Sequence, residues 1–281
     1  MHKTFWLLLL FVVAFMQPVY ADAAQPCDGE TIQAIAAWAG VKGKLASAYK
    51  DPPGGLIAAA ACKKMPNAPG TTIAAIAFDT GRVSEDKFSM LLKVIALVEA
   101  DKVVAAHRSD ITEYQNFVLS PDAYRIDTAR YILSKDVRAF GVVFDLEALG
   151  MNCYDGGSGR NLTLWIREGE NLRAVFGINL YGWNHLEGEN FCAPVSWDTE
   201  EPGKTESAEI TIAIEKTSSH GFADLAITAH VKQNFCQQKN CSITGKRTVR
   251  KVVKYDGQSY RGIDDRYDFW WRSSVHNPHG E

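Results

Sequence analysis

The sequence predicts a mainly β protein, in which antiparallel β-sandwich or barrel-like modules are built from consecutive hairpins, with at most a short N-terminal helix. Two observations lead to this fold class. Apolar and polar residues alternate with a period of two along much of the chain, as in strands with one buried face. Short polar or glycine-containing turns join these runs, which favours antiparallel pairing of sequential strands over parallel strands with helical connections.

The first 21 residues predict an export signal. Lys3 precedes an unbroken apolar run from Phe5 to Met16, and the small residue Ala21 stands at the expected cleavage point. The run is too short to cross a bilayer core of about 30 Å as a helix. We therefore expect residues 1–21 to be a Sec-type signal peptide. The mature chain is expected to be periplasmic or secreted and to lack a transmembrane segment.

Six cysteines fit an oxidising compartment. They fall into three sequential couples, each bracketing one structural unit, although six cysteines allow fifteen connectivities. The preferred pairing is Cys27–Cys62, Cys153–Cys192 and Cys236–Cys241. Zinc is usually held by cysteines spaced two to four residues apart, and no second close pair is present to complete four ligands. We therefore expect no metal.

The N-terminal part of the mature chain predicts one helix and one strand. Asp28 is a good N-cap for a short helix that runs through Ala37, and Gly40 ends it. The alanine-rich run 56–62 is predicted to be a strand, because it has only seven residues and prolines soon follow it.

Four hairpins are predicted after this strand. The paired ranges are 91–99 with 103–107, 161–168 with 172–180, 208–216 with 223–231, and 248–255 with 259–261. The last pair turns at Asp256-Gly257, a dipeptide favoured where both turn residues need a positive φ.

Two features suggest how the chain is divided. Residues 75–79 resemble 141–145, so two strand-plus-hairpin units, about 71–108 and 137–181, are predicted as a weak repeat; the alternative is two hairpins of similar length. The stretch around 200–207 contains proline, glycine and charges, and predicts a boundary between a main β-rich module (22–200) and a smaller C-terminal β unit (207–281). A continuous sheet through this point is the alternative.

The charge of the chain excludes one class of partner. The whole chain has 30 basic and 33 acidic residues, and Lys3 is the one charged residue of the signal, so the mature chain carries 29 against 33, or −4. A nucleic-acid binder would need a concentrated positive field. We interpret the one basic run, 246–254, as the solvated face of a strand, and we expect no nucleic-acid partner.

The strongest candidate for a binding surface is a polar loop beginning at Trp183. Its predicted binding residues are Trp183, Asn184, His185, Glu187 and Trp197. Indole rings stack on the C–H faces of sugars, and amides and carboxylates bind hydroxyls. The structural alternative is a crossover loop, tethered by Cys153–Cys192, whose tryptophans cover the end of a sheet.

A second candidate lies near the C-terminus. If 264–272 is a strand, Tyr267, Phe269 and Trp271 share one face and Trp270 is exposed on the other, which predicts a partner contact at Trp270. The aspartates at 264, 265 and 268 lack the order of an EF-hand, so a calcium site is the weaker interpretation.

No catalytic motif stands out. The run Gly156-Gly157-Ser158-Gly159 differs from the hydrolase elbow Gly-x-Ser-x-Gly, because Arg160 replaces the second glycine. We interpret the run as a flexible turn, and we predict no catalytic residue and no cofactor.

The sequence therefore predicts an exported, disulfide-stabilised, non-catalytic binding protein that recognises or neutralises another exported protein. Its partner is expected to be a protein or a glycan in the envelope or outside the cell. The alternatives are a carbohydrate-binding protein, a secreted hydrolase that uses dispersed carboxylates such as Asp145, Glu187 and Asp265, and an envelope component that assembles through Trp270 and edge strands.

Overall fold

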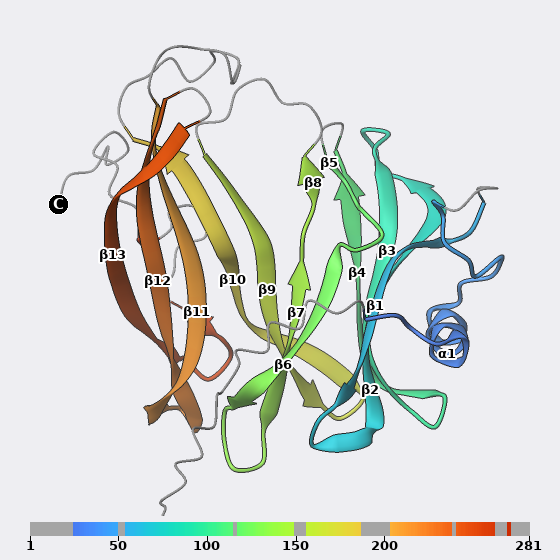
Figure 1. Cartoon of the computed structure of the whole chain (residues 1–281). Helices are drawn as coiled ribbons and strands as arrows, with labels where there is room; N and C mark the ends of the chain where they lie inside the picture. Colours follow the sequence, from blue (N-terminus) through green and yellow to red (C-terminus); the bar gives the residue numbers. More distant parts are fainter. Residues whose placement is uncertain are drawn as a thin grey trace, which may run out of the picture.

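The computed structural model describes residues 25–49, 54–114, 117–148, 156–186, 203–237, 240–261 and 269–270. Within these ranges the chain forms one helix and a large, mostly antiparallel sheet that does not close on itself (Figure 1). The predicted mainly β fold, built from consecutive hairpins with one short N-terminal helix, is confirmed. The predicted signal peptide lies outside the described residues, as do Cys153 and Cys192.

The helix α1 (Gly29–Ala39) begins and ends as its sequence predicts. The Asp28 carboxylate accepts a hydrogen bond of 2.7 Å from the backbone N–H of Thr31 and so caps the first turn. Gly40 ends the helix with a φ of 72°, and its N–H donates to the carbonyls of the last turn. Ile35 and Ala36 are buried against the neighbouring sheet.

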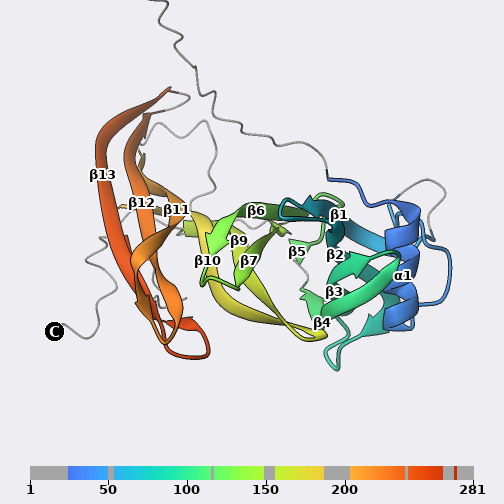
Figure 2. The same cartoon turned by 90° about the horizontal axis from the view of Figure 1, so that it is seen from below.

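The first layer of strands is an antiparallel meander covered on both faces. Its members are β1 (Ile57–Met65), β2 (Ala68–Val83), β3 (Ser89–Glu99) and β4 (Lys102–Glu113). The helix α1 packs on one face, and a second layer of strands packs on the other (Figure 2). This double burial explains why Ile73 to Phe78 is a continuous apolar run rather than an alternating one.

The middle layer is also buried on both faces. Its strands are β6 (Tyr124–Ile132), β7 (Arg138–Phe144), β9 (Gly156–Glu168) and β10 (Asn171–His185). Phe140 and Val142 of β7 face the first layer, whereas Ala139 and Val143 face the third. A separate two-stranded pair joins β5 (Phe117–Val118) to β8 (Glu147–Ala148).

The third layer continues the sheet from β10. It contains β11 (Gly203–Ser219), β12 (Phe222–Gln237), β13 (Asn240–Tyr255) and β14 (Tyr260–Arg261). The last five residues of β10 pair with β11, while Asn171 at its start pairs in parallel with Ala106 of β4. The strand β10 therefore joins all three layers (Figure 1).

The four predicted hairpins are present. Their strands are longer than predicted in the first three, whereas β14 is one residue shorter than predicted. Ala100 and Asp101 form a two-residue turn with φ values of 45° and 59°, and His220 and Gly221 form another with values of 48° and 86°. Both match the positive-φ turns that suit a twisted hairpin. The expectation of two positive φ values at Asp256-Gly257 is wrong, because Gly257 alone has one.

The expected module boundary lies between β10 and β11, whose ends pair with each other. One hydrophobic core includes residues from Tyr131 on β6 to Tyr255 on β13 and Trp270, so strands from both sides of the boundary pack together. The division into 22–200 and 207–281 stays a prediction. So does the weak repeat, although β2–β3–β4 and β7–β9–β10 share the order of one strand followed by a hairpin.

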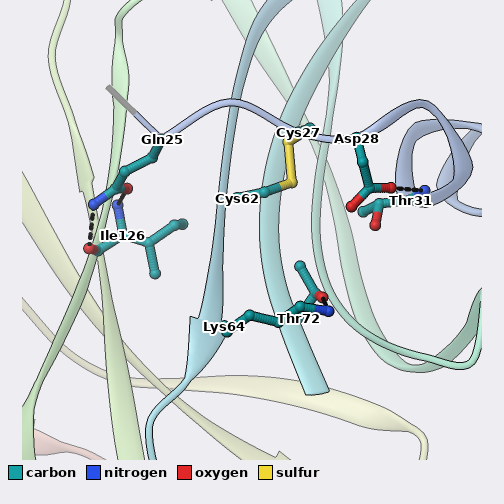
Figure 3. Close-up of a disulfide and its surroundings, with 8 residues drawn as sticks. All are labelled: Gln25, Cys27, Asp28, Thr31, Cys62, Lys64, Thr72 and Ile126. Atoms are coloured by element: carbon teal, nitrogen blue, oxygen red, sulfur yellow. Dashed lines mark hydrogen bonds between the residues drawn. A yellow bond between two sulfur atoms is a disulfide. The ribbon is translucent and has the colours of Figure 1, made fainter. Parts of the chain in front are cut away.

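The predicted disulfide between Cys27 and Cys62 is present (Figure 3). It ties the segment before α1 to β1. Gln25, in the same segment, clamps Ile126 of β6: its amide donates to the Ile126 carbonyl at 3.1 Å, and the Ile126 N–H donates back at 2.6 Å. The residues just before α1 therefore connect the helix, the first layer and the middle layer.

Replacing both Cys27 and Cys62 by alanine should lower the free energy of unfolding by about 3–4 kcal/mol. The bond closes a loop with a sequence separation of 35 residues, and in the chain-entropy description a loop of that length restricts the unfolded chain by about this amount. Urea unfolding of the variant and the oxidised protein measures the difference. A loss below about 1 kcal/mol would contradict the expectation.

Candidate functional site

The structure places the first three predicted binding residues in a strand. Trp183, Asn184 and His185 end β10 and pair with β11, and Trp183 and Asn184 also pair with β9. The prediction that a loop begins at Trp183 is therefore wrong, because both backbone edges of this segment are used by neighbouring strands. Glu187 and Trp197 lie outside the described residues, and so their part in binding stays a prediction.

The glycine-rich run 156–159 is the beginning of β9, so the interpretation as a flexible turn is wrong. Gly157 lies directly opposite Trp183. A Cβ atom on Gly157 would lie 2.7 Å from the Trp183 Nε1 atom, so the absence of a side chain gives the indole its place across the neighbouring strand. Gly157 therefore serves packing within a sheet rather than a turn.

A buried polar cluster lies behind this end of β10. Asn184 is 1 % exposed and lies opposite Glu206 of β11, which is 0 % exposed. The two guanidinium Nη atoms of Arg247 on β13 donate to the two carboxylate oxygens of Glu206 at 2.9 and 2.8 Å. The side-chain amide of Gln233 on β12 donates to the same carboxylate at 3.3 Å. These donors compensate the carboxylate for its lost hydration.

Trp270 belongs to the same region, but it is not a surface residue. It is 2 % exposed and packs in the core between the middle and third layers. Its carbonyl accepts a hydrogen bond from Arg247, and Phe269 and Trp270 form a turn rather than part of a strand. The prediction of an exposed indole is wrong, because the period-two argument assumed a strand at this position.

The structure thus brings together Asn184 and Trp270, which the sequence proposed separately, and adds Glu206, Gln233 and Arg247, which sequence reasoning missed. The alternation pattern of the sequence could have revealed two of these three residues, Glu206 and Arg247. Glu206 has the same alternation phase as the apolar positions 208 and 210, and Arg247 has that of 249. Opposite charges at inward positions of two strands indicate a buried ion pair.

This cluster cross-links β11, β12 and β13 through the Glu206 carboxylate. It joins the end of β10 to the start of β11, and these two strands flank the predicted binding segment that contains Glu187 and Trp197. Among the residues that the structure describes, no three His, Cys, Asp or Glu side chains gather in a way that could hold a metal ion.

The structure gives partial information on one of the two other predicted disulfides and none on the second. Cys241 is disulfide-bonded, and Cys236 is the residue directly opposite it in the β12–β13 ladder. The partner of Cys241 in its disulfide is not established by the described residues, so the Cys236–Cys241 pairing stays a prediction. The Cys153–Cys192 prediction falls on residues outside the described ranges.

The strand β13 presents a long basic edge. Over Asn240–Val253 its partner among the described strands is β12, and β14 pairs only with Lys254 and Tyr255 (Figure 1). The 16 residues of β13 contain no acidic side chain. Its five basic residues are Lys246, Arg247, Arg250, Lys251 and Lys254.

These five side chains differ in their roles. Arg247 points inward to Glu206, which corrects the interpretation of the whole run as a solvated face. Arg250 pairs with Glu215 of β11, while Lys246, Lys251 and Lys254 are exposed. The exposed edge is therefore positively charged, with one buried arginine holding the strand in place.

The chain matches no protein family, no curated protein and no solved structure. The described part of the chain contains no helix of the length and apolarity needed to span a membrane.

Replacing Arg247 by methionine should lower the free energy of unfolding by about 3–5 kcal/mol, because the Glu206 carboxylate then stays buried without its partner charge. The double variant Glu206→Gln/Arg247→Met should lose clearly less, since no uncompensated charge remains. Chemical denaturation of the two single variants and the double variant measures the coupling. Equal losses in Arg247→Met and in the double variant would contradict this account.

Gly157→Ala should displace the Trp183 indole and lower the free energy of unfolding by about 1–3 kcal/mol, which is the usual effect of overpacking a protein core. Gly70→Ala is the matched control, because that strand glycine has open space around its missing Cβ and requires no unusual φ. Near-ultraviolet circular dichroism and urea unfolding report the two effects. Identical spectra and stabilities for Gly157→Ala and the control would refute the proposed packing.

Proposed function

We propose that this protein is an exported binding protein that recognises another exported protein by pairing β13 with an acidic, extended segment of that partner. The observation that carries the proposal is the long β13 edge, which is basic and unpaired by any other described strand over Asn240–Val253. Export rests on the pattern of residues 1–21, and the Cys27–Cys62 disulfide is compatible with it.

An edge strand binds extended segments through its backbone. The N–H and C=O groups on the side of β13 away from β12 can continue the ladder into an added strand. Affinity then comes from backbone hydrogen bonds, and side chains on alternate positions supply selectivity. This geometry favours a protein partner over a glycan, since a glycan has no strand backbone to offer.

The charge of the edge selects the partner. Two copies of this protein that met edge to edge would bring the exposed lysines of one β13, Lys246, Lys251 and Lys254, close to those of the other. Like charges opposed in this way are destabilising, and lysines on edge strands prevent self-pairing. An acidic segment would instead meet Lys246, Lys251 and Lys254, so that complementary charge adds to the backbone pairing.

The edge is also held in a fixed shape before a partner binds. Arg247 fastens β13 to Glu206 on β11, and Arg250 fastens it to Glu215 on the same strand. A strand that is already ordered loses less entropy on binding than a flexible one. The buried ion pair therefore contributes to recognition by positioning the backbone of β13.

The test is the binding of a labelled ten-residue peptide of alternating glutamate and valine, with alternating lysine and valine as the opposite-charge control. The triple variant Lys246→Glu/Lys251→Glu/Lys254→Glu should bind the acidic peptide at least tenfold more weakly. The variant Lys42→Glu/Lys44→Glu/Lys102→Glu has the same net charge but changes exposed lysines far along the chain from β13, and it should bind like the parent protein. Fluorescence anisotropy at about 0.15 M salt, where the Debye length is about 8 Å, gives the dissociation constants.

Hydrogen exchange separates strand addition from simple charge attraction. Backbone amides of Asn240–Val253 that do not pair with β12 should become protected when the acidic peptide binds. Equal weakening in both triple variants, binding without new protection in β13, or equal binding of the two peptides would each overturn the proposal.

A further inference from the structure

A second group of polar side chains lies between the first and middle layers, away from β13. Lys93 occupies β3 between Ala77 of β2 and Ser109 of β4. Its neighbours on the same face, Leu91 and Ile95, are buried in the core that the two layers share. The side chain of Lys93 therefore projects into largely apolar surroundings.

Lys93 has an aromatic contact but no counter-ion. Its ammonium nitrogen lies 6.0 Å from the ring centroid of Phe144 on β7, and no described carboxylate forms an ion pair with it. The nearest inward acids along the neighbouring strands are Asp79 on β2 and Glu113 on β4. Asp79 accepts from the Gly81 N–H at 2.9 Å and Glu113 from the Leu119 N–H at 3.0 Å.

Two hydrogen-bond donors near this side of β3 lack partners: one is on Ser109, directly opposite Lys93 on β4, and the other is on Trp165 in the core that the two layers share. Along β4, His107 precedes Ser109 by two residues, and its ring lies 4.8 Å from that of Trp165 on β9, centroid to centroid. The Ser109 hydroxyl and the Trp165 indole nitrogen are both buried without a hydrogen-bond partner in the structure. Leaving such a group unsatisfied costs about 1–3 kcal/mol, so the Ser109 hydroxyl and the Trp165 indole N–H are both available to donate to an acceptor in this part of the core.

The electrostatics agree with this geometry. Burial lowers the pKa of the Lys93 ammonium, because the charged form loses hydration there. Burial, and then the Lys93 charge, lower the pKa of His107. A bound anion would favour the charged forms of both groups and so would raise both pKa values.

The chemistry of the donors narrows the class of ligand. An ammonium and an indole N–H can only donate hydrogen bonds, and a hydroxyl can donate one. One lysine supplies a single positive charge, which matches a monoanion and would leave a phosphate dianion half compensated. The rings of Phe144, His107 and Trp165 and the neighbouring aliphatic side chains suit an apolar body.

We propose that Lys93, Ser109 and Trp165 bind the carboxylate of a small organic acid whose apolar body contacts Phe144 and His107. Lys93 provides the counter-ion, and the Ser109 hydroxyl and Trp165 indole N–H complete the shell of donors. This site differs from the β13 edge in ligand and in position, since β3 and β4 belong to the first layer and β13 is the far strand of the third (Figure 2).

The probe is decanoate, with decanol as an uncharged ligand of the same chain length, titrated calorimetrically into the oxidised protein. Decanoate should bind at least tenfold more tightly than decanol, and Lys93→Met should reduce the affinity for decanoate at least tenfold. Ser109→Ala should cause a smaller loss. Lys63→Met, at an exposed position on β1, is the control for the removal of one charge and should bind decanoate like the parent protein.

Folding does not obscure this test, because Lys93→Met removes a desolvated, unpaired charge and keeps the apolar stem, so the variant should be at least as stable as the parent. Equal affinity for decanoate and decanol, absence of decanoate binding at millimolar concentration, or unchanged binding by Lys93→Met would each overturn the proposal. An equal loss in Lys63→Met would do so as well, because it would show attraction by net charge alone.

Discussion

The strand β10 is hydrogen-bonded to different layers at its two ends, and the arrangement of the other strands follows from that constraint. Asn171 at its start pairs with Ala106 of β4, while Tyr181–His185 at its end pairs with β11. Along nearly its whole length β10 also pairs with β9. One continuous ladder therefore connects all three layers and holds them against one another. The strands β2 and β7 are apolar on both faces because each of their layers is covered on both sides.

Two charged side chains that lie between layers, the buried Glu206 and the half-buried Lys93, differ in how their charge is compensated. Glu206 is fully surrounded by donors, and its pairing with Arg247 fixes the edge strand β13 against β11. Lys93 lies between the other two layers without a carboxylate partner among the described residues. It is opposite Ser109, whose hydroxyl also lacks a partner. A satisfied pair stabilises one arrangement of the sheets, whereas the donors near Lys93 are the basis of the ligand site that we propose.

Local patterns predicted much of the fold but little of the candidate sites. The Asp28 cap, the Gly40 stop and the hairpin strands depend on residues close in sequence, and the structure has them where expected. The exposed position assigned to Trp270 and the turn assigned to the glycine run are wrong. Both assignments treated a short segment alone, whereas Trp270 packs on a distant core and Gly157 faces Trp183 across a ladder.

By itself, the sequence determined the antiparallel β class, the order of the hairpins and the capped helix, because alternation and turn residues act over short separations. It favoured the Cys27–Cys62 pairing among fifteen possible connectivities, and the structure decided it. Only the tertiary structure decided that Arg247 turns inward and that Lys93 meets Phe144 from another layer. These contacts join strands that are far apart in the chain. They depend on how twisted sheets stack, which no local pattern specifies.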